Sequence, residues 1–415
     1  MLVTGRMREV IPPESHGRRS ERLHVRRSAS RRAVAVVAAV VLVLAAGGIG
    51  AWALMWGPAP TARTPKPSSD ATTTAAKSDS PALVATTAPP MPSGPPTITI
   101  AGVGDMLFDR QVKALIERKG GEAPLAPVAT RLSRADVTVG NLETTLADGG
   151  TRNPIKEPKY AFRGHPAGIE ALQLAGFDAV SLANNHMLDY GWDPLRDTIA
   201  ALDSAGIAHA GSGADSEEAW RPATIETSAG ATVAYLAFTH VLPAGFLAGE
   251  NHPGVASGKM DMKLVTKAVK RAKKTHDYVI VSFHWGVEYE DDANADQVKK
   301  AHQTIDAGAD MVLAHHPHVI QGVEFYKGRL IAYSLGDFVF DHYSRKTGEA
   351  FILEAELGPN GTPKASAVPV YLDEYGRPEF VKGAHAREIL SRLKKISAKH
   401  GTTVELDGRV ARIAP

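Results

Sequence analysis

Short apolar runs rich in β-branched residues recur through residues 97–415, separated by longer stretches with helical spacing. Seven runs predict strands, which end at Gly104, Asn141, Asn184, Phe238, Phe283, His315 and Gly336. The spacing of apolar residues predicts helices over 110–119, 194–205, 262–274 and 293–307. Because the runs are apolar on both faces, we expect central strands covered by helices on each side. The alternation predicts an α/β fold.

The C-terminal stretch repeats these patterns on a smaller scale. Residues 387–399 have helical spacing, and the sequence TTVELDGRVARI that follows is strand-like. We expect this part to serve as scaffold or as a cover on the sheet.

A different apolar pattern occupies 33–56, where 24 consecutive residues are apolar or glycine. As a helix this run would be about 36 Å long, enough to cross a bilayer. Four arginines precede it and Trp52 and Trp56 lie near its other end, so the positive-inside rule predicts a cytoplasmic N-terminus and an extracytoplasmic C-terminal domain. The alternative is a cleavable secretory signal, whose apolar region is normally about 7–15 residues. We therefore expect a single-pass anchor in the cell membrane.

The charge of the chain is concentrated in its N-terminal tail. Residues 1–32 contain nine arginines and three acidic residues, whereas the whole chain has a net charge of +2. The remainder is therefore net negative, which argues against a nucleic-acid-binding surface. The chain has no cysteine, which excludes disulfides, iron–sulfur clusters and thiolate zinc sites.

Composition divides the rest of the chain into a linker and a globular part. Ten of the 27 prolines fall within 57–96, together with many Thr, Ala and Ser residues. Such a segment buries too little apolar surface to offset its ordering entropy, so we expect a disordered, extended stalk. The predicted order is a basic cytoplasmic tail (1–32), a transmembrane anchor (33–56), a linker (57–96) and an extracytoplasmic domain (97–415).

Polar side chains follow directly after several of the predicted strands. They are Asp105, Asn141 with Glu143, Asn184 to His186, His284, and His315 to His318. Loops at the carboxyl ends of strands converge in open α/β sheets. Asp, Glu, Asn and His supplied by separate strands form the ligand set of a divalent-metal site.

Each segment taken alone also has an ordinary structural interpretation. Asp105 could cap the next helix, and Glu143 could be a solvated turn residue. Asn185 and His186 could form a turn with a hydrogen-bonded core histidine, and His284 could belong to an aromatic packing corner. The sequence His-His-Pro-His at 315–318 is harder to explain structurally, because burying three imidazoles is costly unless they are bonded or ligating.

Six motifs together resemble the CapA family, the poly-gamma-glutamate capsule synthesis proteins, which is itself similar to the calcineurin-like metallophosphoesterases. The motifs are GDMLFDR (104–110), NLETTL (141–146), SLANNHMLDYG (181–191), HWGVEYE (284–290), AHHPHVIQG (314–322) and YSLGDFVFD (333–341). The resemblance implies a metallophosphoesterase-like α/β/β/α sandwich, usually tethered outside bacterial cells.

The resemblance also implies roles for individual residues. Six metal ligands are expected: Asp105, Glu143, Asn185, His284, His316 and His318. By the phosphoesterase pattern, Asp105 and His318 hold a first ion, Glu143 bridges two ions, and the other three bind the second. His186 is placed to protonate a leaving oxygen. The implied cofactor is one or two divalent ions, whether Mn, Fe, Zn or Mg.

Two positions depart from the phosphoesterase pattern. Leu107 stands where that superfamily has a histidine, and Glu143 stands where it has a bridging aspartate.

Three functions stay open. The first is capsule or poly-gamma-glutamate synthesis, export or attachment, through a metal site acting on an anionic polymer and alongside other membrane-bound capsule-synthesis proteins. The second is a metal-dependent phosphoesterase of the cell surface, and the third a non-enzymatic polymer-binding or assembly scaffold.

Overall fold

The computed structural model describes residues 94–359 and 361–415. The predicted tail (1–32), the predicted anchor (33–56) and residues 57–93 of the predicted linker lie outside this part of the chain. Among the residues described, no helix combines the length and apolar character needed to cross a membrane.

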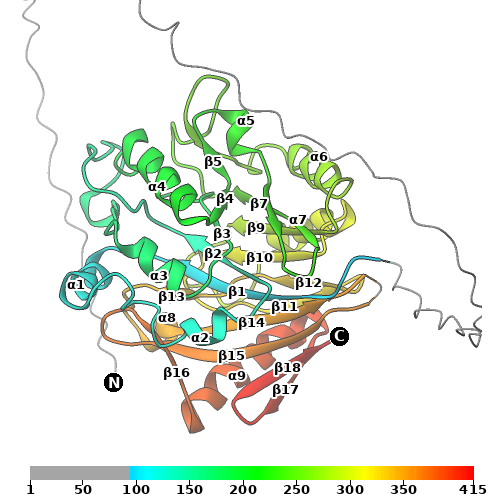
Figure 1. Ribbon diagram of the computed structural model, residues 1–415. Helices are drawn as coiled ribbons and strands as arrows, with labels where there is room; N and C mark the ends of the chain where they lie inside the picture. Colours follow the sequence, from blue (N-terminus) through cyan, green and yellow to red (C-terminus); the bar gives the residue numbers. More distant parts are fainter. Residues whose placement is uncertain (1–93, 360) are drawn as a thin grey trace, which may run out of the picture. The chain divides into compact units, whose positions relative to one another are not determined.

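The larger sheet has ten strands and joins a parallel half to an antiparallel half (Figure 1). The parallel half contains β1 (Ile98–Met106), β2 (Val137–Leu142), β3 (Ala179–Ser181) and β4 (Ala208–Ala210). From β1 the antiparallel half continues through β14 (Glu349–Leu357), β15 (Lys364–Leu372), β18 (Val410–Ala414) and β17 (Thr403–Asp407). Short strands β13 (Asp337–Val339) and β16 (Pro378–Phe380) pair with β1 and β15.

The second sheet has six strands in the order β11-β12-β10-β9-β7-β6. Its parallel centre contains β7 (Thr232–Thr239), β9 (Tyr278–His284), β10 (Met311–His315) and β12 (Arg329–Ala332). Antiparallel edges are formed by β6 (Ala223–Glu226) and β11 (Val323–Tyr326). A separate two-stranded ribbon pairs β5 (Ser212–Gly213) with β8 (Gly254–Val255).

Helices pack on the outer faces of the two sheets, and one helix also packs into the cluster between them. The helices are α1 (Arg110–Lys119), α2 (Ala129–Leu132), α3 (Gly168–Leu174), α4 (Trp192–Ala205), α5 (Ser216–Ala219), α6 (Met262–Ala272), α7 (Ala295–Asp306), α8 (Arg345–Gly348) and α9 (Gly383–Ser397), with 3-10 turns η1 (Pro158–Tyr160) and η2 (Ala398–His400). One apolar cluster joins α1, α3 and α4 to the larger sheet, and another joins α6 and α7 to the second sheet. A third lies between the sheets and includes one face of α9. The layers therefore run helix, sheet, sheet, helix (Figure 1).

The predicted α/β fold is confirmed, and the predicted helices agree closely with the structure, whereas the runs predicted to end at Asn184 and Gly336 form strands that end at Ser181 and Ala332. The predicted helix at 110–119 coincides with α1, and the other three predicted helices appear as α4, α6 and α7. The expectation of helices on each side of the strands needs correction. The apolar runs divide between two sheets, so each sheet has helices on one face and the other sheet on its second face.

Close contact between β1 and β13 fixes the edge of the larger sheet at which the polar residues gather. Asp105 pairs in register with Asp337 on one side and with Asn141 on the other. A Cβ on Gly104 would overlap the carbonyl oxygen of Gly336, so only glycine permits this approach. In the second sheet His284 is in register with His315. Parallel pairing thus brings the ends of several strands to neighbouring positions.

Candidate metal centre

Asp105 supplies a buried carboxylate at the end of β1. Its Oδ1 accepts a hydrogen bond from Nδ2 of Asn141 at 2.8 Å, and its Oδ2 accepts one from the backbone N–H of His316 at 2.9 Å. The first bond lies within the larger sheet, between β1 and β2, and the second connects that sheet to the loop that follows β10. They also fix the orientation of the carboxylate toward the space between the sheets.

Glu143, which directly follows β2, is the centre of the cluster. Its Oε1 lies 3.7 Å from Nε2 of His284 and 3.8 Å from the Nε2 atoms of His186 and His318. These separations are too long for hydrogen bonds, and Oε1 is a buried oxygen without a hydrogen-bond partner in the described part of the chain. Atoms that share one metal ion stand roughly 3–4 Å apart, because each lies about 2.0–2.2 Å from the ion. The spacing around Oε1 matches that of metal ligands.

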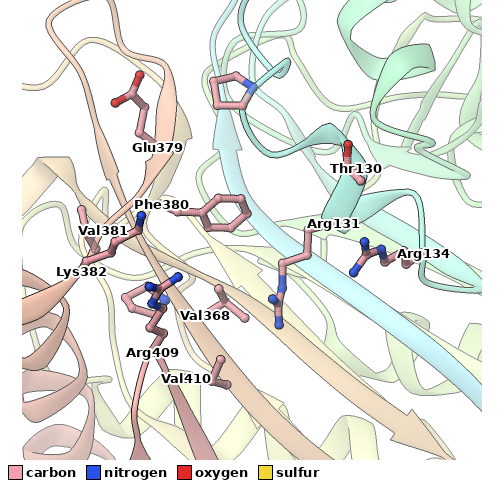
Figure 2. Close-up of a pocket in the computed structure, with 12 residues that line it drawn as sticks. Thr130, Arg131, Arg134, Val368, Glu379, Phe380, Val381, Lys382, Arg409 and Val410 are labelled. Carbon is pink, nitrogen blue, oxygen red and sulfur yellow. The ribbon is translucent and has the colours of Figure 1, made fainter.

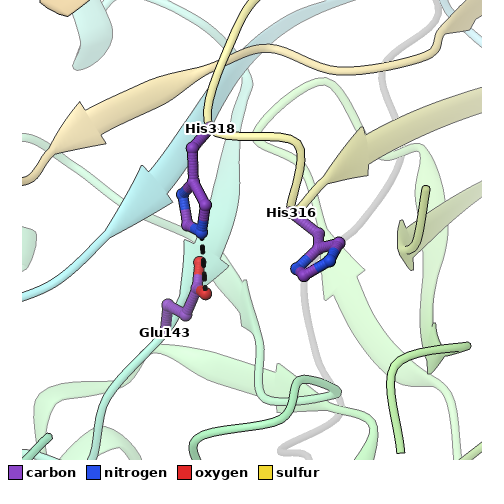
Figure 3. A group of neighbouring side chains, drawn as sticks. All are labelled: Glu143, His316 and His318. Carbon is purple, nitrogen blue, oxygen red and sulfur yellow. Dashed lines mark ion pairs between the residues drawn. The ribbon is translucent and has the colours of Figure 1, made fainter. Parts of the chain in front are cut away.

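The loop after β10 carries two of the imidazoles on an uncommon backbone. His316 has a φ of 95° and His318 a φ of 55°, both in the left-handed region that non-glycine residues rarely adopt. Such conformations cost about 1–3 kcal/mol each and concentrate at functional sites. Figure 3 shows both rings beside Glu143, with the His318 ring directed at the carboxylate.

Three overlapping groups of side chains have ligand atoms close enough to hold a metal ion. The groups are Asp105, Glu143 and His284; Glu143, His316 and His318; and Asp105, His318 and Asp337, with ligand atoms in each lying within 4.8 Å of one another. Mixed imidazole and carboxylate donors suit Zn, Fe and Mn. The residues present therefore fit one or more divalent ions.

Asn185 and His186 form a second contact network at the edge of this cluster. Oδ1 of Asn185 lies 2.7 Å from Nε2 of His284, and its Nδ2 lies 2.9 Å from Nε2 of His186. On the other side of the His186 ring, Nδ1 lies 2.7 Å from Oδ2 of Asp189. Lys156 in turn pairs with Oδ1 of Asp189 at 2.9 Å. His186 is thus held in one orientation, and its ring packs against Phe162.

Burial sets the protonation states of His284 and His316. Burial, followed by the nearby His318, lowers the pKa of His316 to about 3. The pKa of His284 is well below its usual value, again because of burial and then neighbouring imidazoles. Both rings are therefore neutral near pH 7, the form that binds a metal.

The pKa values of two carboxylates in the cluster shift in the opposite direction, upward. Burial, and then the charge of Asp105, raises the pKa of Glu143 well above its usual value. Burial also raises the pKa of Asp337 to about 7, although His318 opposes the shift. Burial and the neighbouring acidic group thus disfavour the charged carboxylates, and a bound divalent cation would compensate their charge.

The structure brings all six predicted metal ligands and His186 into one cluster. The sequence placed Asn141 among the polar residues at strand ends but gave it no role, and the structure shows that it contacts Asp105. Asp189 and Lys156, which hold His186, were not among the predicted site residues. Asn141 and Asp189 do lie inside recognised motifs, so proximity to a motif was the available signal. Lys156 lies in a charged loop outside these motifs, and no pattern in the sequence linked it to His186.

Leu107 and Asp337 also have defined places. Leu107 is fully buried and packs with Phe162, Phe340 and Leu372, so its side chain belongs to a small apolar cluster. Asp337 Oδ1 lies 2.8 Å from Nδ1 of His318. This contact orients the ring so that its Nε2 faces Glu143.

A cavity of about 320 Å³ gives access to the cluster from outside. Its inner wall includes Asn185, His186, His318 and Asp337. Its remaining lining residues include Arg110, Lys156, Tyr160, Glu288, Tyr289 and Tyr343. The cluster can therefore meet a polar ligand from solution.

Comparisons with known proteins give matches over much of the chain. Residues 99–342 match the model of a family described as bacterial capsule synthesis protein PGA_cap. The capsule biosynthesis protein CapA of Bacillus anthracis is 34% identical over 290 residues, which cover 69% of this chain and 70% of that protein. The PGA biosynthesis protein CapA of Bacillus subtilis (strain 168) is 32% identical over 273 residues, covering 66% and 71%. A "probable polyglutamine synthesis accessory protein" of Mycobacterium tuberculosis is 35% identical over 265 residues, covering 59% and 68%.

Proposed function

This chain belongs to the PGA_cap family of bacterial capsule synthesis proteins, and from that premise we propose that it takes part in capsule or poly-gamma-glutamate synthesis, export or attachment. In this proposal, a divalent-metal site of the chain acts on an anionic polymer. Two similar proteins have names that refer to capsule or PGA biosynthesis. The residues of the metal centre all fall within the 99–342 match.

The observation that carries this proposal is the environment of Glu143 Oε1. Three imidazole Nε2 atoms surround this buried oxygen at 3.7–3.8 Å, and no hydrogen bond satisfies it among the described residues. An unsatisfied buried carboxylate oxygen is costly unless a cation compensates it. A divalent ion bound between Glu143 and the histidines removes that cost.

We assign the metal-holding role to the six predicted residues, with Asp337 as a further candidate. Asp105, Glu143, His284, His316 and His318 offer the carboxylate and imidazole atoms that lie closest together, and Asn185 adds an amide oxygen beside His284. When bound, one or two divalent ions polarise the bond to be broken and lower the pKa of water. Asp337 fixes the ring of His318 through its Nδ1.

His186 has the geometry of a proton-handling residue beside this centre. The Asp189 carboxylate at 2.7 Å favours a proton on Nδ1 and leaves Nε2 toward the cluster. Lys156 completes the support by pairing with Asp189. We propose that His186 moves a proton at Nε2 to or from the substrate oxygen.

We base the proposed membrane topology of the chain on its N-terminal sequence. The apolar segment 33–56 anchors the chain in the cell membrane, and the arginine-rich tail 1–32 stays in the cytoplasm. The linker 57–96 then carries the metal domain outside, where it meets the polymer and other membrane-bound capsule-synthesis proteins. Labelling of single introduced cysteines at positions 20 and 80 in intact cells tests this arrangement, and labelling from outside at position 20 would contradict it.

Metal analysis of the purified full chain tests the metal centre. We expect the wild type to retain a divalent ion after dialysis, and His316→Ala and Glu143→Ala to lose it. His276→Ala is the matched control, because His276 lies outside the cluster and contacts Thr224 and Thr275. Equal metal content in all four proteins would overturn the proposal.

The alternative of a surface phosphoesterase is favoured by one specific feature, the oriented His186 at the wall of an open cavity. It predicts hydrolysis of simple phosphoesters that stops on chelation and returns with Mn, Zn or Fe. No turnover by metal-loaded protein would rule out this alternative.

The scaffold alternative is favoured by Leu107, whose side chain lies in an apolar cluster instead of the metal centre. It predicts that His186→Ala leaves capsule formation intact in cells, whereas deletion of 33–56 abolishes it. Loss of capsule in the His186 variant, with normal protein levels, would exclude a purely structural role.

A further inference from the structure

A second site of interest is a cavity that shares no lining residue with the cavity over the metal centre. It has a volume of about 580 Å³ and runs over β15, between α2 on one side and β16, the start of α9 and the β17–β18 turn on the other. Figure 2 shows Arg131 and Arg134 on the first side and Lys382 and Arg409 on the second, with Phe380 between them.

A second cavity of about 370 Å³ extends this one across β14 toward β1. Both cavities are lined by Arg131 and Arg134, so they adjoin at these two side chains, and we treat them together. We call the pair the basic groove, after its five cations: Arg131, Arg134, Lys364, Lys382 and Arg409. None of the described residues that line it also lines the cavity over the metal centre.

The basic groove has an excess of positive charge that the protein leaves uncompensated. Its three carboxylates are all engaged: Glu354 with Arg131 at 2.7 Å, Glu356 with Lys364 at 2.9 Å and Glu379 with Arg377 at 2.6 Å. Within residues 94–359 and 361–415, no carboxylate pairs with Arg134, Lys382 or Arg409. All three are exposed. Three cations therefore remain available to an anionic ligand.

The local backbone adds to this charge. Lys382 is the N-cap residue of α9, and no side chain caps that helix end. The positive end of the helix macrodipole therefore lies beside the Lys382 side chain.

The floor of the groove is apolar. Val368 and Val410 line it, and the ring of Phe380 is 39% exposed there. Cations above an apolar floor suit a flexible chain with spaced charges and aliphatic segments, since the charges meet the rim and the methylene groups cover the floor. A compact phosphate has no such apolar part.

We propose that the basic groove is a binding site for an extended polycarboxylate chain, which it holds at a distance from the metal centre. The identity of the polymer as poly-glutamate rests on the proposed function. The assignment of the groove as a polycarboxylate-binding site rests on the charge and shape of the groove. Guanidinium groups pair with carboxylates through two parallel hydrogen bonds, and Arg131 already makes this contact with Glu354. Lys364, Lys382 and Arg409 lie beyond the 99–342 match, so the site extends past the residues that the family model covers.

Fluorescence anisotropy with end-labelled poly-gamma-glutamate of defined length tests this proposal on the full chain. We expect the wild type to bind, with an affinity that falls as salt rises. Arg134→Glu with Arg409→Glu should weaken binding about ten-fold or more at low salt, because like charges then face the polymer. Arg134→Lys with Arg409→Lys should retain most of the binding, because the charge is kept.

The matched control is Lys263→Glu with Lys267→Glu, which makes the same charge change on exposed positions of α6, over the second sheet. This control should bind the polymer within about two-fold of the wild type. Equal binding by the wild type and the Arg134/Arg409 reversal would overturn the proposal, as would no binding by the wild type. Tighter binding of a polyphosphate of similar length would also overturn it, in favour of a phosphate polymer.

Metal analysis of the same proteins separates this proposal from the metal centre. The Arg134/Arg409 reversal should keep its metal, and His316→Ala should keep its polymer binding. Absence of metal from the wild type would contradict the proposed function and leave the groove standing. Loss of polymer binding in His316→Ala, with unchanged folding, would place the polymer at the metal centre and overturn the separate site.

Discussion

Nδ1 of His318 lies 2.8 Å from Oδ1 of Asp337, and Nε2 of the same ring lies 3.8 Å from Oε1 of Glu143. The two carboxylates come from different parts of the larger sheet, β13 and the end of β2. Their placement on opposite sides of one imidazole determines which nitrogen faces the candidate metal position. Orienting contacts of this kind are a regular feature of metal sites.

Asp337→Asn should weaken metal binding without unfolding the protein. The amide keeps the shape of the side chain and removes its negative charge, so the orientation and basicity of His318 both suffer. We expect a loss of about 10–100-fold in metal affinity, measured by competition with a chromophoric chelator. Asp306→Asn, at the exposed end of α7 where Asp306 pairs with Lys327, is the control. Unchanged affinity in Asp337→Asn would show that the contact is dispensable.

Metal binding should stabilise the folded chain. The ligand atoms come from both sheets, and unfolding separates them. A ligand at 100 times its dissociation constant adds about 2.7 kcal/mol to the free energy of unfolding. We therefore expect Tm to fall on chelation and to rise again on reloading. In His316→Ala, chelation should change Tm much less; an equal change in both proteins would place the ion elsewhere.

Gly104→Ala should destabilise the domain strongly. A Cβ at this position overlaps the carbonyl oxygen of Gly336, which is backbone and cannot turn aside. The strand pair β1–β13 must then separate, at a cost of about 3 kcal/mol or more. Chemical denaturation measures this directly. Gly361→Ala, where a Cβ meets no atom within 4 Å, should leave the free energy of unfolding nearly unchanged.

Asp178→Asn should change how stability depends on pH. Burial raises the pKa of Asp178 from 3.8 to about 6; the Thr138 backbone N–H acts against this shift and Asp136 reinforces it. The folded state therefore holds this proton more tightly than the unfolded state does, so the contribution of Asp178 to stability declines as pH rises from about 4 to about 6. The asparagine retains an acceptor for Thr138 and has no charge to bury. We expect its Tm to exceed that of the wild type near pH 7 and the two to converge below pH 4. A constant difference at every pH would contradict this explanation.

The sequence by itself determined the local elements and the chemistry of the site. Helix α1 follows from the spacing of Val112, Leu115 and Ile116, and β9 and β10 follow from continuous apolar runs. These patterns depend only on residues that are close in the sequence, so they can be recognised without knowledge of the fold. The residue types at the strand ends likewise indicated metal chemistry before any distance was known.

Only the tertiary structure decided which strands share a sheet and which atoms meet. The runs ending at Gly104 and Phe283 have the same apolar pattern, yet they lie in opposite sheets, because apolar faces do not specify their partners. The long antiparallel pair β14–β15 was not predicted. The orienting role of Asp189 and the basic groove depend on segments far apart in the chain. Burial and register, which arise from long-range packing, set those contacts, so no pattern along the sequence could supply them.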